Sequence, residues 1–95
     1  MRLTTEERAQ IKEQVNRVFG KDSRVWLFGS RMDDTKKGGD IDLYIEPKYL
    51  THELKQKINL LTQLQLTLGD QKIDIVIAKD PNRLIEKEAR KGVLL

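Results

Sequence analysis

The fold is decided by two neighbouring stretches, VWLFGSR at residues 25–31 and GDIDLYIE at residues 39–46. An apolar run of strand length stops at Gly29-Ser30, and a second strand starts with aspartates at positions i and i+2, Asp40 and Asp42. In a strand, this spacing directs both carboxylates to the same face, with their Cα atoms about 6.5 to 7 Å apart. Two carboxylates placed in this way can hold a divalent cation between them.

The two aspartates need a counter-ion, because neighbouring like charges raise each other's pKa and cost energy unless a cation or a proton intervenes. Upstream of them, Gly29 allows a ligand to approach the backbone closely. Ser30 supplies a hydroxyl and an N–H, which together can hold phosphate oxygens. A phosphate cradle beside a metal site suggests a nucleoside triphosphate as ligand.

Each part of this pattern has an ordinary explanation when taken alone. Gly-Ser after a strand is a common turn, and an Asp-x-Asp pair is often a solvated strand edge. The order of the parts favours a functional site, since the Gly-Ser turn, the Asp-x-Asp strand and a later strand with Asp74 follow one another.

The segment from Lys72 to Ile77 alternates isoleucines with other residues and predicts a third strand. If its isoleucines face the helices, Asp74 points to the side of Asp40 and Asp42 wherever the two strands are neighbours. An Asp74 that is merely exposed is the alternative, but a charge in the middle of a β-branched strand is unusual without a use.

Helix signals divide the rest of the chain. Thr4-x-x-Glu7 is a capping box, which predicts a first helix from Thr5 to Phe19 that ends at Gly20. Thr51 is the expected cap of a second helix that Gly69 ends, and Asp80-Pro81 is the expected start of a third that runs to Lys91. The first strand, at residues 24–28, is apolar enough to be central, with Trp26 in the core.

Some apolar residues exceed what one helical stripe or a small core needs. The second helix has a stripe at Leu54, Ile58, Leu61, Leu64 and Leu68, which the leucines at 60 and 66 widen. The chain ends in Val93-Leu94-Leu95, which we expect at the sheet edge or in an interface. We therefore predict that the protein associates through a surface near Leu60, Leu66, Val93, Leu94 and Leu95.

Composition sets outer bounds. We expect residues 1–95 to form a single α/β (α+β) domain, a small mixed sheet with helices packed on one face and a modest core. The chain has no cysteine, no apolar run of membrane-spanning length and no signal-peptide start, which together predict a soluble, cytoplasmic protein. A net charge of +3, with both signs interspersed, suits an anionic ligand but does not indicate a dedicated nucleic-acid binder.

The sequence resembles the DNA polymerase beta-like nucleotidyltransferase superfamily. The resemblance rests on Gly29-Ser30-Arg31 followed by GDIDL at residues 39–43, and the small size is similar to the minimal nucleotidyltransferase (MNT) branch. It implies that Gly29 and Ser30 bind the triphosphate, with Arg31 as an added positive charge. It also implies that Asp40, Asp42 and Asp74 hold two Mg²⁺ ions.

One stretch departs from the family pattern. Many members follow Gly-Ser-Arg with small and basic residues, whereas this chain has Met32-Asp33-Asp34. Lys36 or Lys37 is a candidate for the missing positive charge, and we expect Asp33 and Asp34 to be exposed to solvent.

The MNT branch implies a specific role, since its members are often antitoxin partners of helical HEPN ribonucleases and transfer AMP from ATP to a tyrosine of the toxin. Two alternatives stay open. One is nucleotidyl transfer to a small molecule, as in aminoglycoside nucleotidyltransferases, which have an added domain. The other is a binding module that neutralises its partner by covering it. Association with copies of itself is an alternative to the toxin as partner.

Overall fold

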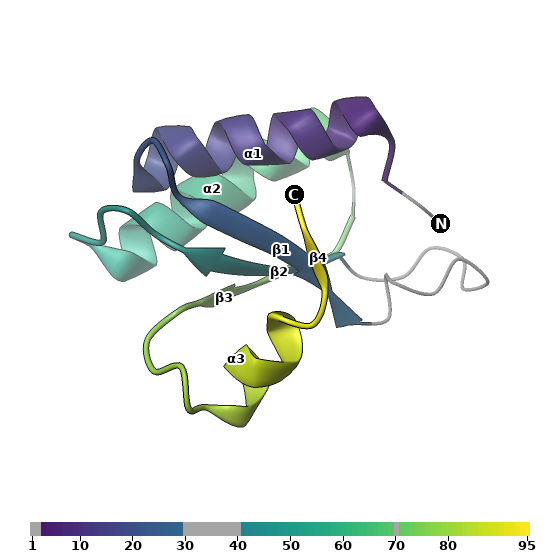
Figure 1. The fold of residues 1–95 in the computed structure, drawn as a ribbon. Helices are drawn as coiled ribbons and strands as arrows, with labels where there is room; N and C mark the ends of the chain where they lie inside the picture. Colours follow the sequence, from purple (N-terminus) through teal and green to yellow (C-terminus); the bar gives the residue numbers. More distant parts are fainter. Residues whose placement is uncertain (1–2, 30–40, 70) are drawn as a thin grey trace.

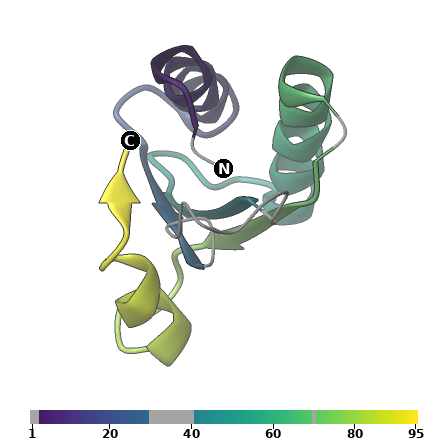
Figure 2. The ribbon, with the colours of Figure 1, turned by 90° about the vertical axis from the view of Figure 1, so that its right-hand side faces the viewer.

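The computed structural model describes residues 3–29, 41–69 and 71–95. Seven elements follow one another within these described residues. They are α1 (Thr5–Phe19), β1 (Arg24–Phe28), β2 (Ile41–Glu46), α2 (Glu53–Leu68), β3 (Ile73–Ile77), α3 (Leu84–Ala89) and β4 (Val93–Leu94). Helices α1 and α2 lie side by side over one face of the sheet, and the short α3 lies on the opposite side (Figures 1 and 2).

The sheet is mixed and has the strand order β3-β2-β1-β4. Strand β1 pairs antiparallel with β2 and β4, whereas β2 pairs parallel with β3. The expected central position of β1 is confirmed, and Val25, Trp26 and Leu27 are buried in it. The small mixed α+β fold predicted from the sequence is therefore confirmed.

Helix α1 begins and ends where the sequence predicts. Thr4 Oγ1 accepts a hydrogen bond of 3.0 Å from the Glu7 N–H, and Glu7 Oε1 accepts one of 2.8 Å from the Thr4 N–H. These bonds satisfy two N–H groups that the first turn of a helix leaves without partners. The buried face of α1 consists of Ile11, Val15 and Phe19, which pack on the sheet and α2.

Helix α2 differs from its prediction at its start and on its surface. Its N-cap is His52, whose side chain makes no capping bond, so the expected cap by Thr51 is wrong. Gln56 instead reaches back, and its Oε1 accepts from the N–H groups of Thr51 and His52, at 3.0 Å each. The same side chain donates to the Val18 carbonyl and so ties α2 to α1.

The apolar stripe of α2 is also shifted from its expected position. Leu60 and Leu64 are fully buried, while Leu54, Ile58 and Leu66 are 71%, 54% and 77% exposed. Leu60 is thus a core residue and not a surface one, because the helix turns residues 60 and 64 toward the sheet.

Two apolar clusters hold the molecule together. The larger one lies between the sheet and α1 and α2, and it includes the inward isoleucines of β2 and β3. The smaller one joins Trp26 and Tyr44 of the opposite sheet face to Ala89 of α3. The sequence predicts helices on one face of the sheet, and the structure adds that α3 covers part of the second face.

The C-terminal region forms a shorter helix than the sequence predicts. Asp80 accepts a hydrogen bond from the Asn82 N–H, so it closes a turn before the helix, and the N-cap is Arg83. After α3, β4 adds to the edge of β1, and the Leu95 N–H donates to the Val25 carbonyl at 2.9 Å. The expectation that Val93-Leu94-Leu95 edges the sheet is confirmed.

Candidate active site

Three residues from three strands form a row across one end of the sheet. Phe28 of β1 is the register partner of Asp42 of β2, and Asp42 is the parallel register partner of Asp74 of β3. Register partners point to the same face of a sheet and lie about 5 Å apart. Asp42 and Asp74 are thus direct neighbours on the face opposite α1 and α2, as the alternation of isoleucines predicts.

Gly29 lies against the Asp42 carboxylate. Its φ angle is 79°, a region that residues with a side chain rarely adopt. A Cβ atom added to Gly29 would collide with Asp42 Oδ2. The chain therefore needs glycine here both for its backbone angle and for the space beside the carboxylate, and the expected approach of a ligand to Gly29 stays a prediction.

The two described acids differ in burial, and this bears on what they can bind. Asp42 is half-buried, whereas Asp74 is exposed on the edge strand. Carboxylate oxygens are the ligands that Mg²⁺ prefers, so two neighbouring carboxylates open to solvent on one side fit a magnesium ion. Within residues 3–29, 41–69 and 71–95, no three potential ligands gather to hold a metal ion.

Several predicted site residues lie outside the described residues. They are Ser30, Arg31, Asp40, and the loop residues Asp33, Asp34, Lys36 and Lys37. The proposed phosphate cradle and the third carboxylate therefore stay predictions. The structure brings together Gly29, Asp42 and Asp74.

The C-terminal segment packs closely beside this row. At Gly92, between α3 and β4, an added Cβ would collide with the Leu27 carbonyl oxygen and would come within 2.9 Å of Phe28 Cβ. Because Phe28 is the neighbour of Asp42, the turn from α3 to β4 braces the strand that positions the site. The sequence predicts only that the third helix ends at Lys91, and it does not reveal this contact of Gly92.

A buried carboxylate, Glu86 of α3, is the main feature that sequence reasoning missed. Its side chain is 1% exposed. Its Oε1 accepts from the Tyr44 hydroxyl at 2.9 Å, and its Oε2 accepts from the Lys79 and Asp80 N–H groups at 3.0 and 2.9 Å. Arg83 adds an ion pair of 3.2 Å.

These contacts set the protonation state of the pair. Burial alone would raise the pKa of Glu86, but the N–H groups of Asp80 and Lys79, the Tyr44 hydroxyl and the Arg83 charge outweigh it and lower the pKa. Burial and the hydrogen bond to Glu86 raise the pKa of Tyr44. Glu86 is therefore an ionised structural anchor that joins α3 to β2.

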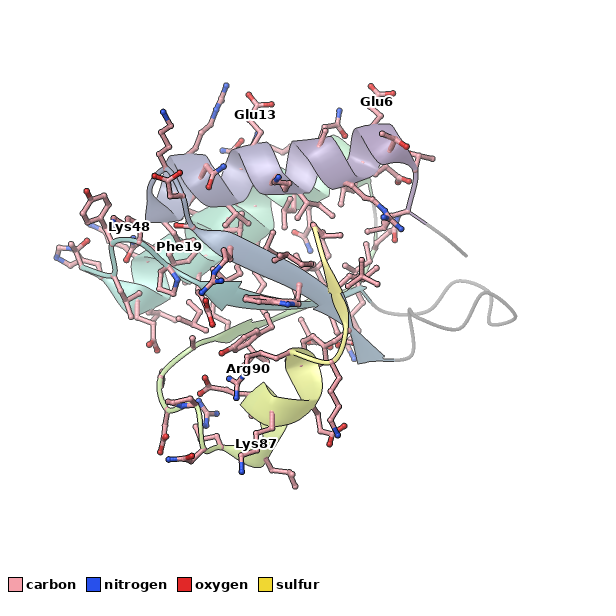
Figure 3. The ribbon with its side chains drawn as sticks, in the orientation of Figure 1. Glu6, Glu13, Phe19, Lys48, Lys87 and Arg90 are labelled. Carbon is pink, nitrogen blue, oxygen red and sulfur yellow. The ribbon has the colours of Figure 1, made fainter. Side chains whose placement is uncertain are left out.

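Basic residues at the C-terminal end of α3 make contacts within the molecule. Arg90 donates to the Tyr44 hydroxyl at 3.2 Å and to the Pro81 carbonyl at 2.8 Å, and Lys91 pairs with Glu88 at 3.2 Å. Figure 3 shows Arg90 turned toward the sheet, while Lys87 points away from it. Arg90 is thus structural, and contact with a ligand is left to other cations.

Comparison with known families decides what this row of residues belongs to. A family model described as "Polymerase beta, Nucleotidyltransferase" matches residues 6–95. The chain belongs to this nucleotidyltransferase family. The match includes all three strands of the row, and it supports a nucleotidyl-transfer activity, which in this family generally uses a nucleoside triphosphate and a divalent metal.

Two further observations complete the comparison. No curated protein matches the sequence. Among the described residues of this nucleotidyltransferase, no helix has both the length and the apolar character needed to cross a membrane.

Proposed function

We propose that this chain transfers a nucleotidyl group from a nucleoside triphosphate to a hydroxyl group, with two Mg²⁺ ions bound by Asp40, Asp42 and Asp74. The observation that supports this best is the pairing of Asp42 with Asp74 on one sheet face beside Gly29. Two carboxylates one strand apart repel each other, and a divalent cation relieves that repulsion.

The residues divide the reaction between them. Gly29 and Ser30 bind the β and γ phosphates, which leave as pyrophosphate, and Arg31 offsets their charge. Asp74, on the open edge strand, receives the proton of the acceptor hydroxyl. Bound Mg²⁺ supplies charge neutralisation at the attacking and leaving oxygens. Positioning and electrostatics then account for most of the catalysis.

The donor that we propose is ATP, and the acceptor is a tyrosine of a HEPN-type ribonuclease toxin, so that the protein acts as an antitoxin. Similarity to the MNT branch supports this choice. Exposed apolar side chains also support a protein partner, because Leu54, Leu66 and Leu94 are 71%, 77% and 53% exposed. A partner that covered them would gain roughly 1.5 to 3 kcal/mol for each fully buried side chain.

A labelling experiment tests the activity. The purified protein is incubated with ATP labelled at the α-phosphate, Mg²⁺ and the product of the neighbouring gene, and label on that product is measured. Asp42→Asn should abolish labelling. Asp22→Asn is the matched control, because Asp22 is exposed, lies away from the row, and has a φ angle of 74° that asparagine also tolerates.

Each outcome is informative. Labelling that Asp42→Asn abolishes and Asp22→Asn preserves supports the proposal. Tight binding of the partner without any labelling would instead support a module that neutralises its partner by covering it. Undiminished labelling by Asp42→Asn would contradict the role of the paired acids.

Sedimentation tests the partnership separately. We expect the protein to associate with the neighbouring gene product or with itself at tens of micromolar. The protein is sedimented alone and together with the neighbouring gene product. A monomer in both samples would contradict the expected interface.

A further inference from the structure

The last segment of the chain packs closely against the end of β1. Strand β4 pairs with β1 at Leu27 and Val93, and the next step of that antiparallel register brings Gly92 opposite Phe28. A Cβ atom added to Gly92 would collide with the Leu27 carbonyl oxygen and would come within 2.9 Å of Phe28 Cβ. The φ angle of Gly92 is not positive, so the close approach alone excludes a side chain at this position.

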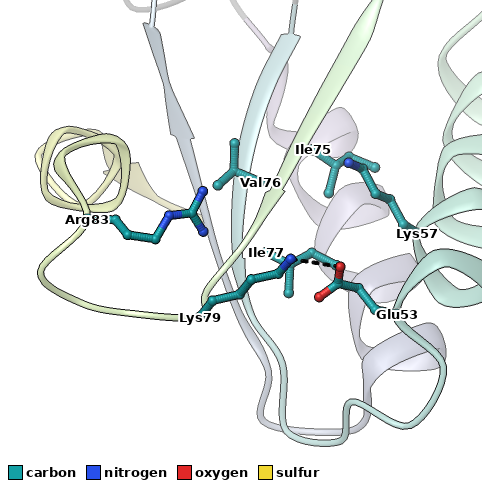
Figure 4. A pocket seen from close by; sticks show the side chains of 7 residues that line it. All are labelled: Glu53, Lys57, Ile75, Val76, Ile77, Lys79 and Arg83. Atoms are coloured by element: carbon teal, nitrogen blue, oxygen red, sulfur yellow. Dashed lines mark ion pairs between the residues drawn. The ribbon is translucent and has the colours of Figure 1, made fainter.

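The chain on both sides of Gly92 is fixed. Before it, α3 is anchored by the buried Glu86, and Arg83 at the start of α3 extends toward the sheet (Figure 4). After it, the Leu95 N–H donates to the Val25 carbonyl at 2.9 Å. The atoms that Gly92 approaches are a backbone oxygen and a Cβ, which cannot turn aside as the end of a flexible side chain can. A larger residue here would therefore press on the end of β1.

The end of β1 leads directly into the candidate site. Phe28 is the register partner of Asp42, and it is followed by Gly29, whose lack of a Cβ leaves space for the Asp42 carboxylate. A displacement of Phe28 therefore changes how Gly29 meets this carboxylate. The contacts of Gly92 with β1 and of Gly29 with Asp42 form one continuous path from the C-terminal segment to the site.

We propose that Gly92 is a positioning residue, which holds the end of β1 so that Gly29 stays against the Asp42 carboxylate. Docking of β4 is thereby coupled to ligand binding at the site. This coupling rests on the proposed nucleotidyl transfer, because it requires Asp42 to hold the metal ion of a bound nucleotide. It is reciprocal, since a ligand that binds better to the docked arrangement must stabilise that arrangement by the same free energy.

Strand β4 can report this coupling. It has two residues and lies at the edge of the sheet, where its main partner is β1. A short edge strand with few contacts opens locally at a lower free energy than the centre of a sheet. Its amide exchange therefore responds to a ligand that stabilises the docked arrangement.

Hydrogen exchange in the unaltered protein tests the coupling. The amide of Leu95, which bonds to the Val25 carbonyl, shows whether β4 is docked. We expect ATP with Mg²⁺ to slow its exchange by about fivefold or more. The amide of Gln56, which bonds to the His52 carbonyl at the start of α2, is the matched control and should not change.

Gly92→Ala tests the contact itself. We expect the added methyl group to shift the NMR signals of the Gly29 and Asp42 amides and to weaken binding of ATP with Mg²⁺ by about fivefold or more. Ala89→Gly is the matched control, because it removes a fully buried methyl group from the same segment without adding an atom beside Phe28. It should lower stability as well, but leave those signals and the affinity for ATP unchanged.

The proposal is overturned if Gly92→Ala binds ATP as the parent protein does, or if both variants weaken binding in proportion to their loss of stability. It is also overturned if ATP leaves the exchange of the Leu95 amide unchanged, and this measurement alone decides if Gly92→Ala does not fold. A parent protein that fails to bind ATP with Mg²⁺ at millimolar concentration would instead count against the proposed function. The Asp42 signal of Gly92→Ala would then decide whether Gly92 positions the carboxylate.

Discussion

Two adjacent rows on the same sheet face place carboxylates in opposite environments. In the row of Trp26, Tyr44 and Val76, the sheet is covered by α3, and the carboxylate of Glu86 is buried among four donors. In the row of Phe28, Asp42 and Asp74, two carboxylates are neighbours, and the outer one is exposed.

The difference separates a structural acid from candidate functional acids. The charge of Glu86 is compensated within the protein, so replacing Glu86 should lower the free energy of unfolding. Asp74 has solvent around it, so its loss should affect what the protein binds. One charged group is enclosed by the fold, and the other is left available to a cation and a substrate.

Asp74→Asn should show the largest effect, and it should be confined to activity. We expect nucleotidyl transfer to fall by about a hundredfold or more, because a metal-holding carboxylate is lost. The free energy of unfolding should change by no more than about 0.5 kcal/mol, since the residue is exposed. If Asp74→Asn also lowered the free energy of unfolding substantially, Asp74 would be a structural acid like Glu86, and the two rows would not differ.

Glu86→Ala should show the opposite behaviour. We expect it to lower the free energy of unfolding by about 3 kcal/mol or more, because Tyr44, Arg83 and two backbone N–H groups lose a buried partner. Glu88→Ala, on the exposed side of α3, is the matched control and should change it little. Chemical denaturation measures both, and equal effects would show that Glu86 is not an anchor.

Gly29→Ala tests the position next to the row of Phe28, Asp42 and Asp74. The new Cβ must displace the Asp42 carboxylate, and the backbone angle is strained as well, so we expect a cost of about 2 kcal/mol and a loss of transfer. Gly69→Ala is the control, because Gly69 has a φ angle of 86° but no atom within 4 Å of the added Cβ. It should carry the strain alone and keep full activity.

The pH dependence of stability should report Glu86. Its folded pKa is lowered from the ordinary value of 4.5, so its contribution is present above that value and is lost as the pH falls through the folded pKa. We expect unfolding free energy to fall in this acidic range, and Glu86→Gln to make the fall shallower. Parallel profiles of the two proteins between about pH 5 and pH 3 would show that other carboxyls dominate.

The sequence predicts best what depends on local pattern. The capping box marks the start of α1 and Gly20 marks its end, and the isoleucine alternation of β3 turns Asp74 toward Asp42. The sequence predicts the ends of an element poorly where a contact with a side chain outside the local pattern determines them. The start of α2 depends on Gln56, whose amide also reaches Val18, and no local cap reveals that contact.

The two acids of α3 illustrate the same limit. Glu86 and Glu88 lie two residues apart in one charged run, yet only Glu86 is turned toward Tyr44. Nothing in their immediate neighbours distinguishes them, because the distinction arises when α3 packs on the sheet.

The central claim is that Asp42 and Asp74 hold the same metal ion, and a double-mutant cycle of metal affinity tests it most directly. Mn²⁺ binding in the presence of ATP is measured for the parent protein, Asp42→Asn, Asp74→Asn and the double variant. We predict that each single change weakens binding at least about tenfold and that the double change costs clearly less than the sum of the two. Strictly additive losses, or tight Mn²⁺ binding by the double variant, would contradict a shared metal site.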